Sequence, residues 1–155
     1  MPLAPSSAAA IVVSLLLAGA SLAAGAQNAP SRTVPVKIRI VTEHGPIVAS
    51  LSDTPASRDF LALLPLKLTL GDHAATEKIA DLPERLSKKG APAGYAPRTG
   101  DMAYYAPWGN LALYHKDFRY SDGLIKLGQI DEGLAILRRS GAMRVTVERV
   151  EPAQP

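Results

Sequence analysis

The chain has 155 residues, with 17 Lys and Arg against 14 Asp and Glu, and it contains no cysteine. Disulfides, cysteine-ligated metal sites and lipoprotein attachment through a cysteine are therefore excluded. The basic residues are interspersed with acidic ones, as in Glu84-Arg85, and they form no run of five or six. This pattern is typical of a solvated surface of mixed charge, so we expect no nucleic-acid partner.

The N-terminal segment is predicted to be a cleavable signal peptide. The first charged side chain is Arg32, and an apolar stretch runs from Ala8 to Ala26. The stretch closes on Ala24-Gly25-Ala26, a pattern that signal peptidase cleaves, which assigns residues 1–26 to the signal peptide. The alternative is an uncleaved membrane anchor, because about 19 apolar residues approach the length that spans a bilayer. Ala and Gly make the stretch only mildly hydrophobic, which favours cleavage, a periplasmic or secreted protein and no stable membrane anchoring afterwards.

The remaining chain is long enough for one domain. Residues 27–35 are assigned to a linker and residues 36–151 to the domain. The domain is predicted to open with a hairpin. Apolar and polar residues alternate over 36–40, and a partner strand returns over 47–51 after the turn residues His44-Gly45-Pro46.

Two short helices are predicted, one after the second strand and one before the last strand. Thr54-Pro55 begins the first helix, with a capping hydroxyl followed by proline at the first helical position, and Pro65 ends it. Asp131 is expected to cap the second helix, with Leu134 and Leu137 facing inward.

Five further stretches have the pattern of strands, namely 66–70, 101–105, 111–115, 124–130 and 143–147. Residues 71–100 are rich in Gly and Pro and are predicted to be mostly loop, with 76–81 open to either a strand or a helical turn. A loop of this length is either functional or contains a short element. Seven or eight short strands predict a mainly β fold, a closed barrel whose open ends are covered by the two helices.

Several stretches resemble the cyclophilin-like fold family. Residues 37–64 (KIRIVTEHGPIVASLSDTPASRDFLALL) resemble the opening hairpin and first helix of cyclophilins, and residues 127–134 (LGQIDEGL) resemble their late strand and second helix. Four runs are similar to small bacterial cyclophilin-like proteins of unknown function: LPL at 64–66, EKI at 77–79, GDMAYYAPWGN at 100–110 and GLIKLG at 123–128. The resemblance covers most of the domain and implies a closed cyclophilin-like β-barrel.

The same resemblance bears on activity. Prolyl isomerases of this family use an arginine in a Phe-His-Arg context, followed by a Phe-x-x-Gln segment. In the resemblance, residues 66–100 occupy the part of the chain where both motifs belong. They contain neither motif, and their only arginines are Arg85 and Arg98. Twisting an X-Pro amide costs about 20 kcal/mol, which the enzyme lowers by donating a hydrogen bond to the proline nitrogen. The resemblance therefore implies a domain that binds a peptide segment or small ligand without converting it. The alternatives are a divergent prolyl isomerase and a structural module that docks a partner protein.

A candidate binding surface lies where the aromatic residues gather. Most of them fall between Tyr104 and Tyr120, around the tip of the hairpin predicted over 101–115. Because Trp and Tyr combine a large contact area with a polar group, this tip is predicted to contact a ligand. The predicted ligand-binding residues are Tyr105, Pro107, Trp108, Asn110, Tyr114 and Tyr120. The alternative is structural packing: strand alternation places Tyr104 and Tyr105 on opposite faces, so at least one belongs to the core. The resemblance also implies that Tyr120 occupies the position at which cyclophilins have a tryptophan in their binding pocket.

No catalytic or metal-binding pattern stands out. His44, His73 and His115 are far apart in the sequence and show no ligand spacing, so no metal site is expected. Asp72 and Glu77 lie close to His73, but nothing in the sequence fixes their geometry for acid–base chemistry, and loop polarity explains them equally well. The glycines do not follow the spacing of a nucleotide-binding loop. We therefore expect no catalytic residue, no metal and no cofactor.

Overall fold

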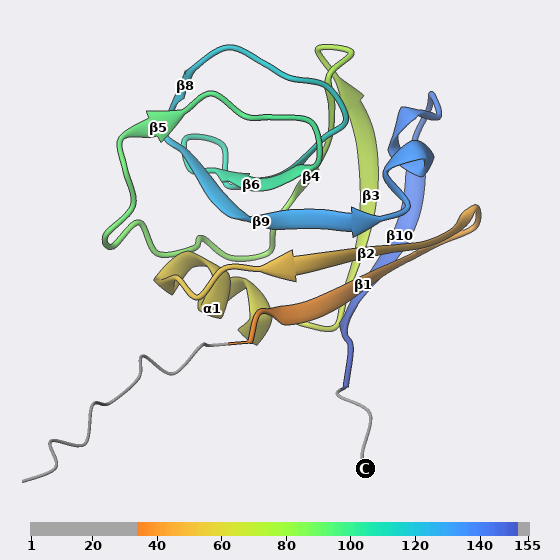
Figure 1. Cartoon of the computed structure of the whole chain (residues 1–155), viewed down its shortest axis with the longest axis horizontal. Coiled ribbons are helices and arrows are strands. Elements are labelled where there is room, and N and C mark those ends of the chain that lie inside the picture. The colour runs from red at the N-terminus through yellow and green to blue at the C-terminus, as the bar shows by residue number, and fades with distance from the viewer. Residues whose placement is uncertain (1–33, 152–155) are drawn as a thin grey trace, which may run out of the picture. The chain divides into compact units, whose positions relative to one another are not determined.

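The computed structural model describes residues 34–151 (Figure 1). The predicted signal peptide and most of the predicted linker lie outside the described residues. The elements are, in chain order, β1 (Val36–Thr42), β2 (Gly45–Leu51), α1 (Pro55–Ala62), β3 (Leu66–His73), β4 (Glu77–Asp81), β5 (Gly94–Tyr95), β6 (Asp101–Tyr105), β7 (Asn110–Tyr114), β8 (Ser121–Asp122), β9 (Leu124–Glu132), the 3-10 helix η1 (Leu134–Arg138) and β10 (Met143–Arg149).

Eight of these strands form a closed barrel in the order β1-β10-β3-β4-β7-β6-β9-β2. All neighbouring pairs around the barrel are antiparallel. The two short strands β5 and β8 pair with each other outside the barrel. The prediction of a mainly β fold with a closed barrel of seven or eight strands is confirmed.

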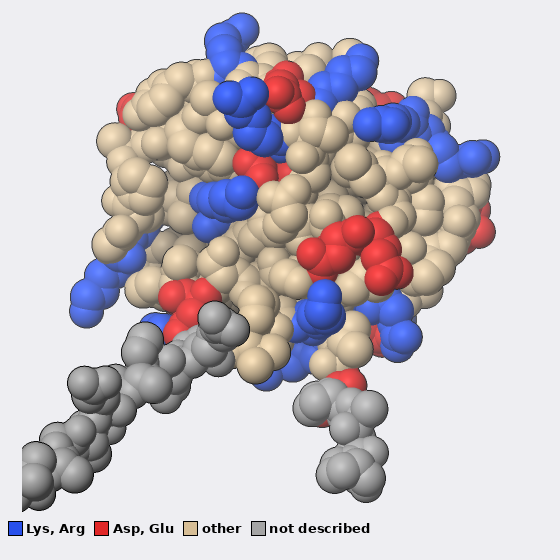
Figure 2. Space-filling view, in the orientation of Figure 1, with Lys and Arg blue, Asp and Glu red and all other residues tan. Residues whose placement is uncertain are grey.

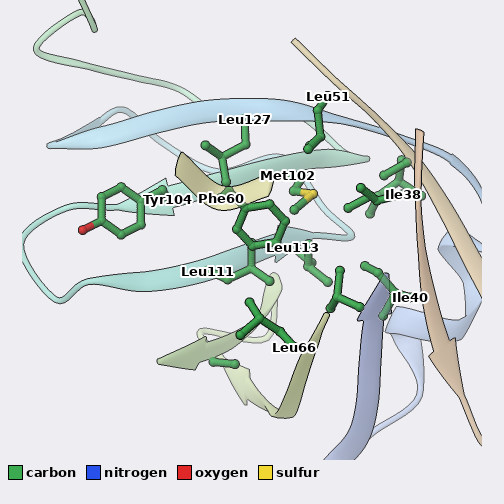
Figure 3. Packing of buried hydrophobic residues seen from close by; sticks show 14 of the residues in the cluster. Ile38, Ile40, Leu51, Phe60, Leu66, Met102, Tyr104, Leu111, Leu113 and Leu127 are labelled. Carbon is green, nitrogen blue, oxygen red and sulfur yellow. The ribbon is translucent and has the colours of Figure 1, made fainter. Parts of the chain in front are cut away.

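The barrel interior is built from the apolar side chains that alternate with polar ones along each strand. Ile38 and Ile40 of β1 and Leu111 and Leu113 of β7 are fully buried and point into the same core (Figure 3). Alternation produces this result because successive side chains of a strand point to opposite faces. Phe60 from α1 is also fully buried in this core and lies among the strand residues (Figure 3).

The first helix begins as predicted. The Thr54 hydroxyl accepts a hydrogen bond from the Ser57 backbone nitrogen at 3.2 Å, and Pro55 takes the first helical position. The helix ends at Ala62, shortly before Pro65. Its side chains at Phe60 and Leu61 are buried, so the helix covers one end of the barrel.

The second helix is shorter than expected, and its predicted cap is wrong. Asp131 belongs to β9, where its carboxylate accepts hydrogen bonds from Lys37 Nζ at 2.9 Å and from the Ser50 hydroxyl at 2.6 Å. The carboxylate thus ties neighbouring strands together instead of capping a helix. The helix η1 follows Gly133, a left-handed residue that provides no side-chain cap, and Leu137 is its fully buried residue.

The prediction that residues 71–100 are mostly loop is confirmed for most of the segment, but its first part belongs to the barrel, and 77–81 takes the strand alternative. Strand β3 continues to His73, and β4 pairs with both β3 and β7, so the barrel closes through it. Lys78 obscured this strand in the sequence, because it stands opposite the core residue Leu113 and is fully buried. Its ammonium group reaches Asp72 Oδ1 at 2.5 Å and the Gly141 carbonyl at 2.8 Å. A long side chain can bury its stem while its charged end finds polar partners.

Basic and acidic side chains are interspersed over the face of the domain shown in Figure 2. Among the ion pairs, Arg39 and Glu148 join the neighbouring strands β1 and β10 at 2.7 Å, and Lys37 of β1 reaches across β2 to Asp131 of β9 at 2.9 Å. None of the helices within residues 34–151 has the length and apolar character needed to cross a membrane.

Candidate ligand-binding site

A second apolar cluster lies on the outer face of the barrel wall. In β7, Leu111 and Leu113 face the core, whereas the alternating residues Ala112 and Tyr114 belong to this outer cluster. Tyr95 from β5 and the loop residue Phe118 pack against it. The segments that carry β5 and β8 therefore lie over this part of the wall and leave a hollow beside it.

The hollow is a pocket of about 480 Å³. Ligand pockets in proteins are commonly in the range of about 300–1,000 Å³. Strands β3, β4, β6, β7 and β8, the β3–β4 and β6–β7 turns and the loop before β8 supply its walls. The lining residues are His73, Ala74, Glu77, Ile79, Tyr105, Trp108, Asn110, Ala112, Tyr114, Phe118, Arg119 and Ser121.

Trp108 forms the rim of the pocket at the tip of the β6–β7 hairpin. Its ring meets Tyr105 edge-on at 5.2 Å between centroids and His73 at 5.5 Å. The turn is fixed by a hydrogen bond from the Gly109 nitrogen to the Tyr105 carbonyl at 2.8 Å, and Gly109 adopts a positive φ of 72° that favours glycine. Trp108 is 57% exposed, so a large aromatic surface faces solvent at the pocket mouth.

Buried polar side chains form the floor. Glu77, Asn110 and Tyr114 are each at most 5% exposed and border the pocket. The Thr76 hydroxyl donates to Glu77 Oε2, and Glu77 stands directly opposite Tyr114 across β4 and β7. Burial and then the Glu77 carboxylate raise the pKa of Tyr114, so its hydroxyl stays protonated near neutral pH. The side-chain oxygen of Asn110 is buried without a hydrogen-bond partner.

An exposed arginine also borders the pocket. Arg119 borders the pocket, and its guanidinium carbon lies 4.8 Å from the centroid of the Phe118 ring. This is the geometry of a cation–π contact, which holds the charged group against the aromatic wall.

A model of the cyclophilin-like family matches residues 40–148 of the chain. The chain belongs to the cyclophilin-like family. Among solved structures, the cyclophilin-like domain is similar to a hypothetical protein from Archaeoglobus fulgidus, studied in solution, with a TM-score of 0.59 and 18% sequence identity over 79% of this chain and 100% of that one. At that identity the likeness extends to the fold alone. No curated protein shows significant similarity to the chain.

The cyclophilin-like domain brings four of the six predicted site residues together. Tyr105, Trp108, Asn110 and Tyr114 line one pocket, but Pro107 and Tyr120 do not. The Pro107 ring instead packs against the backbone of Gly123, where an added Cβ would lie 2.8 Å from it. Tyr120 is 56% exposed and outside the pocket. That these residues bind a ligand stays a prediction.

Strand alternation correctly separated the two neighbouring tyrosines. Tyr104 is 1% exposed in the barrel core, and its hydroxyl accepts a hydrogen bond from the Leu86 nitrogen at 3.2 Å. Tyr105 faces the pocket instead. The aromatic cluster thus contributes to both packing and the pocket, as the two alternatives together had allowed.

Other pocket residues were not identified from the sequence. Glu77 and His73 were attributed to loop polarity, because the predicted strand over 66–70 ended before His73 and the strand around Glu77 was only one of two alternatives. Residues 77–81 do not alternate between apolar and polar side chains, so no clear signal for β4 was present in the sequence. Phe118 and Arg119 lie in an irregular loop, and no periodic pattern points from there to a pocket on the barrel wall.

The two arginines considered for isomerase chemistry lie elsewhere. Arg85 Nη1 donates to the Ala106 carbonyl at 2.5 Å and braces the hairpin turn. Arg98 is exposed and forms an ion pair with Asp117 at 3.0 Å. Neither residue lines the pocket. Within residues 34–151, no group of three or more His, Asp or Glu side chains is arranged to hold a metal ion.

Proposed function

We propose that this cyclophilin-like domain is a binding module, which holds a peptide segment or small ligand in the outer-wall pocket without converting it. The observation that carries the proposal is the combination of a hollow of about 480 Å³, an exposed aromatic rim and a floor of buried polar side chains. Binding sites commonly combine an apolar wall with a few polar groups that fix the orientation of the ligand.

Packing alone accounts poorly for this arrangement. An exposed tryptophan at a pocket mouth leaves apolar surface in water, where it contributes little to folding. A buried amide oxygen without a partner costs about 1–3 kcal/mol, and Asn110 carries that cost at the pocket floor. A bound ligand offsets the first cost because it covers the ring, and it offsets the second when the Asn110 amide rotates its oxygen toward the pocket.

The test uses the intrinsic fluorescence of Trp108, the single tryptophan of the chain. The purified protein is titrated with proline-containing peptides and a panel of small metabolites. We expect at least one saturable change, which is lost in Tyr105→Ala and retained in Tyr120→Ala, an exposed tyrosine outside the pocket. If no ligand changes the signal while a partner protein co-purifies, the docking alternative replaces this proposal.

Arg119 is the one observation that favours isomerase activity as a second candidate. Its guanidinium stands at the mouth of an aromatic pocket, which is the setting that twisting an X-Pro amide requires. A protease-coupled assay with a proline peptide separates the two functions. The binding proposal expects no acceleration. Acceleration that is lost in Arg119→Ala but kept in Arg98→Ala would establish the enzyme instead.

We also propose that the domain acts in the periplasm or outside the cell. The proposal is supported by the apolar stretch of residues 8–26, which ends in a signal peptidase pattern. Mass spectrometry of the protein recovered from the cell envelope should give a chain that begins at Gln27. A chain that retains Met1 and fractionates with the membrane would favour the anchor alternative.

A further inference from the structure

We infer that the pocket receives the positively charged end of its ligand, an ammonium or guanidinium group, with Glu77 as the counter-charge. This inference rests on the proposed function and narrows it from ligands in general to organic cations. It covers small amines and guanidines as well as lysine or arginine side chains of a peptide, because all of them share this end group.

The Glu77 carboxylate borders the pocket and forms no ion pair within residues 34–151, although His73 stands opposite it across β3 and β4. Glu77 is only 5% exposed. Seven ion pairs join charged side chains in the described part of the chain, and none of them includes Glu77. A buried carboxylate that has hydrogen bonds but no opposite charge remains poorly compensated. A cation that enters from the pocket would supply the missing charge.

The walls above Glu77 suit a cation better than they suit an anion. Aromatic faces attract cations that lie within about 6 Å of the ring centre, and tryptophan does so most strongly. Four aromatic residues line this pocket: Tyr105, Trp108, Tyr114 and Phe118. The Phe118 ring already holds the Arg119 guanidinium on its face, which shows that this wall accepts a cation.

Asn110 adds a second acceptor at the floor. Its side-chain oxygen has no partner, and a 180° rotation of the amide can present the oxygen or the nitrogen to a ligand. Ammonium and guanidinium groups have several N–H donors and no acceptor, so they match a carboxylate and an amide oxygen together. A neutral alcohol or amide could satisfy the oxygen but would leave the Glu77 charge uncompensated.

The positive charge of Arg119 at the mouth sets the direction of the ligand. Arg119 is exposed, and His73 stands at the rim against Trp108. A cation is repelled at the Arg119 side and attracted toward the Glu77 floor. A carboxylate at the far end of the same ligand would instead meet Arg119, so a zwitterion would bind with its cationic end inward.

The experiment compares matched pairs of probes that differ in charge. Butylguanidinium is compared with butylurea, and butylammonium with butanol, by calorimetry and by Trp108 fluorescence. We expect each cation to bind at least about tenfold more tightly than its neutral counterpart, a difference of about 1.4 kcal/mol. Glu77→Gln should abolish this preference. Glu43→Gln, which removes an exposed carboxylate elsewhere, should leave it intact.

A second variant keeps the inference testable if Glu77→Gln does not fold. Trp108→Leu alters an exposed residue, so the fold should persist, and calorimetry replaces fluorescence as the readout. It should weaken the cations at least about threefold more than the neutral probes. If neutral ligands bind in the pocket and cations bind no better, the inference is overturned while the proposed function stands. If no ligand of any charge binds, the proposed function fails and the inference fails with it.

Discussion

The turn between β3 and β4 holds two alanines in the left-handed conformation, with φ values of 51° at Ala74 and 55° at Ala75. The Thr76 nitrogen donates to the His73 carbonyl at 3.1 Å and closes the turn. Two successive positive φ values define a type I′ turn, for which Asn-Gly is the preferred pair. We therefore expect the double substitution Ala74→Asn and Ala75→Gly to stabilise the domain.

The size of the effect follows from two opposing terms. The left-handed conformation costs an alanine about 1–2 kcal/mol, and glycine avoids that cost. Glycine also lowers the free energy of unfolding by about 0.5–1 kcal/mol, because it leaves the unfolded chain more conformational freedom than alanine does. Asparagine tolerates the conformation better than alanine, which adds to the gain. The net increase in the free energy of unfolding should be about 1 kcal/mol, or about 4 °C in Tm for a domain of this size.

Thermal and urea unfolding, followed by circular dichroism, measure this change. The matched control is Ala62→Gly, at an exposed position in α1, where right-handed geometry is required and a loss of up to about 1 kcal/mol is expected. The reasoning is refuted if the double variant unfolds at the same or a lower temperature than the natural protein while the control behaves as expected. Because His73 and Ala74 border the pocket, ligand titrations of the same variant also show whether the turn shapes the site.

Two further predictions concern packing and pH. Gly128→Ala would place a Cβ atom 2.1 Å from a backbone oxygen of β2, so it should destabilise the domain by about 3 kcal/mol or more in urea unfolding, whereas Gly71→Ala has open space and should be tolerated. Hydrogen bonds from Thr99, and then from Arg98, lower the pKa of Asp117 from 3.8 to about 2. The ionised Asp117 carboxylate should stabilise the fold fully at pH values above 3.8, and this stabilisation should be lost as the pH falls toward about 2. Urea midpoints should therefore fall less over this range in Asp117→Asn; an identical acid response in both proteins would contradict this assignment.

The strands with regular alternation were predictable from the sequence, and the strand with a charged inward residue was not. Ile38 and Ile40 in β1 alternate with basic residues, and their burial follows from period two alone. In β4 an inward position is taken by Lys78, whose ammonium group contacts Asp72 across the β3–β4 hairpin and the carbonyl of Gly141, which is distant in the sequence. Such compensation depends on the folded structure, so the local pattern left 76–81 open between a strand and a helical turn.

The pocket residues were likewise predictable only in part. Tyr105 and Tyr114 were predictable, because an aromatic hairpin is a local feature of the sequence. Glu77 was overlooked together with its strand, and Arg119 reaches the pocket through a loop whose path is set by packing against the barrel wall. Asp131 illustrates the opposite error, since a residue suited to capping a helix forms cross-strand contacts with Lys37 instead.

The closure of the barrel has a mechanical consequence. Strand β1 pairs with β10, with Ile38 opposite Arg149, and the Val150 nitrogen donates to the Lys37 carbonyl at 3.0 Å. A force that pulls these two strands apart at their terminal ends would load their hydrogen bonds one after another, as a zipper opens, and not all at once in shear. The seam between the first and last strands is therefore where the domain should yield first under tension.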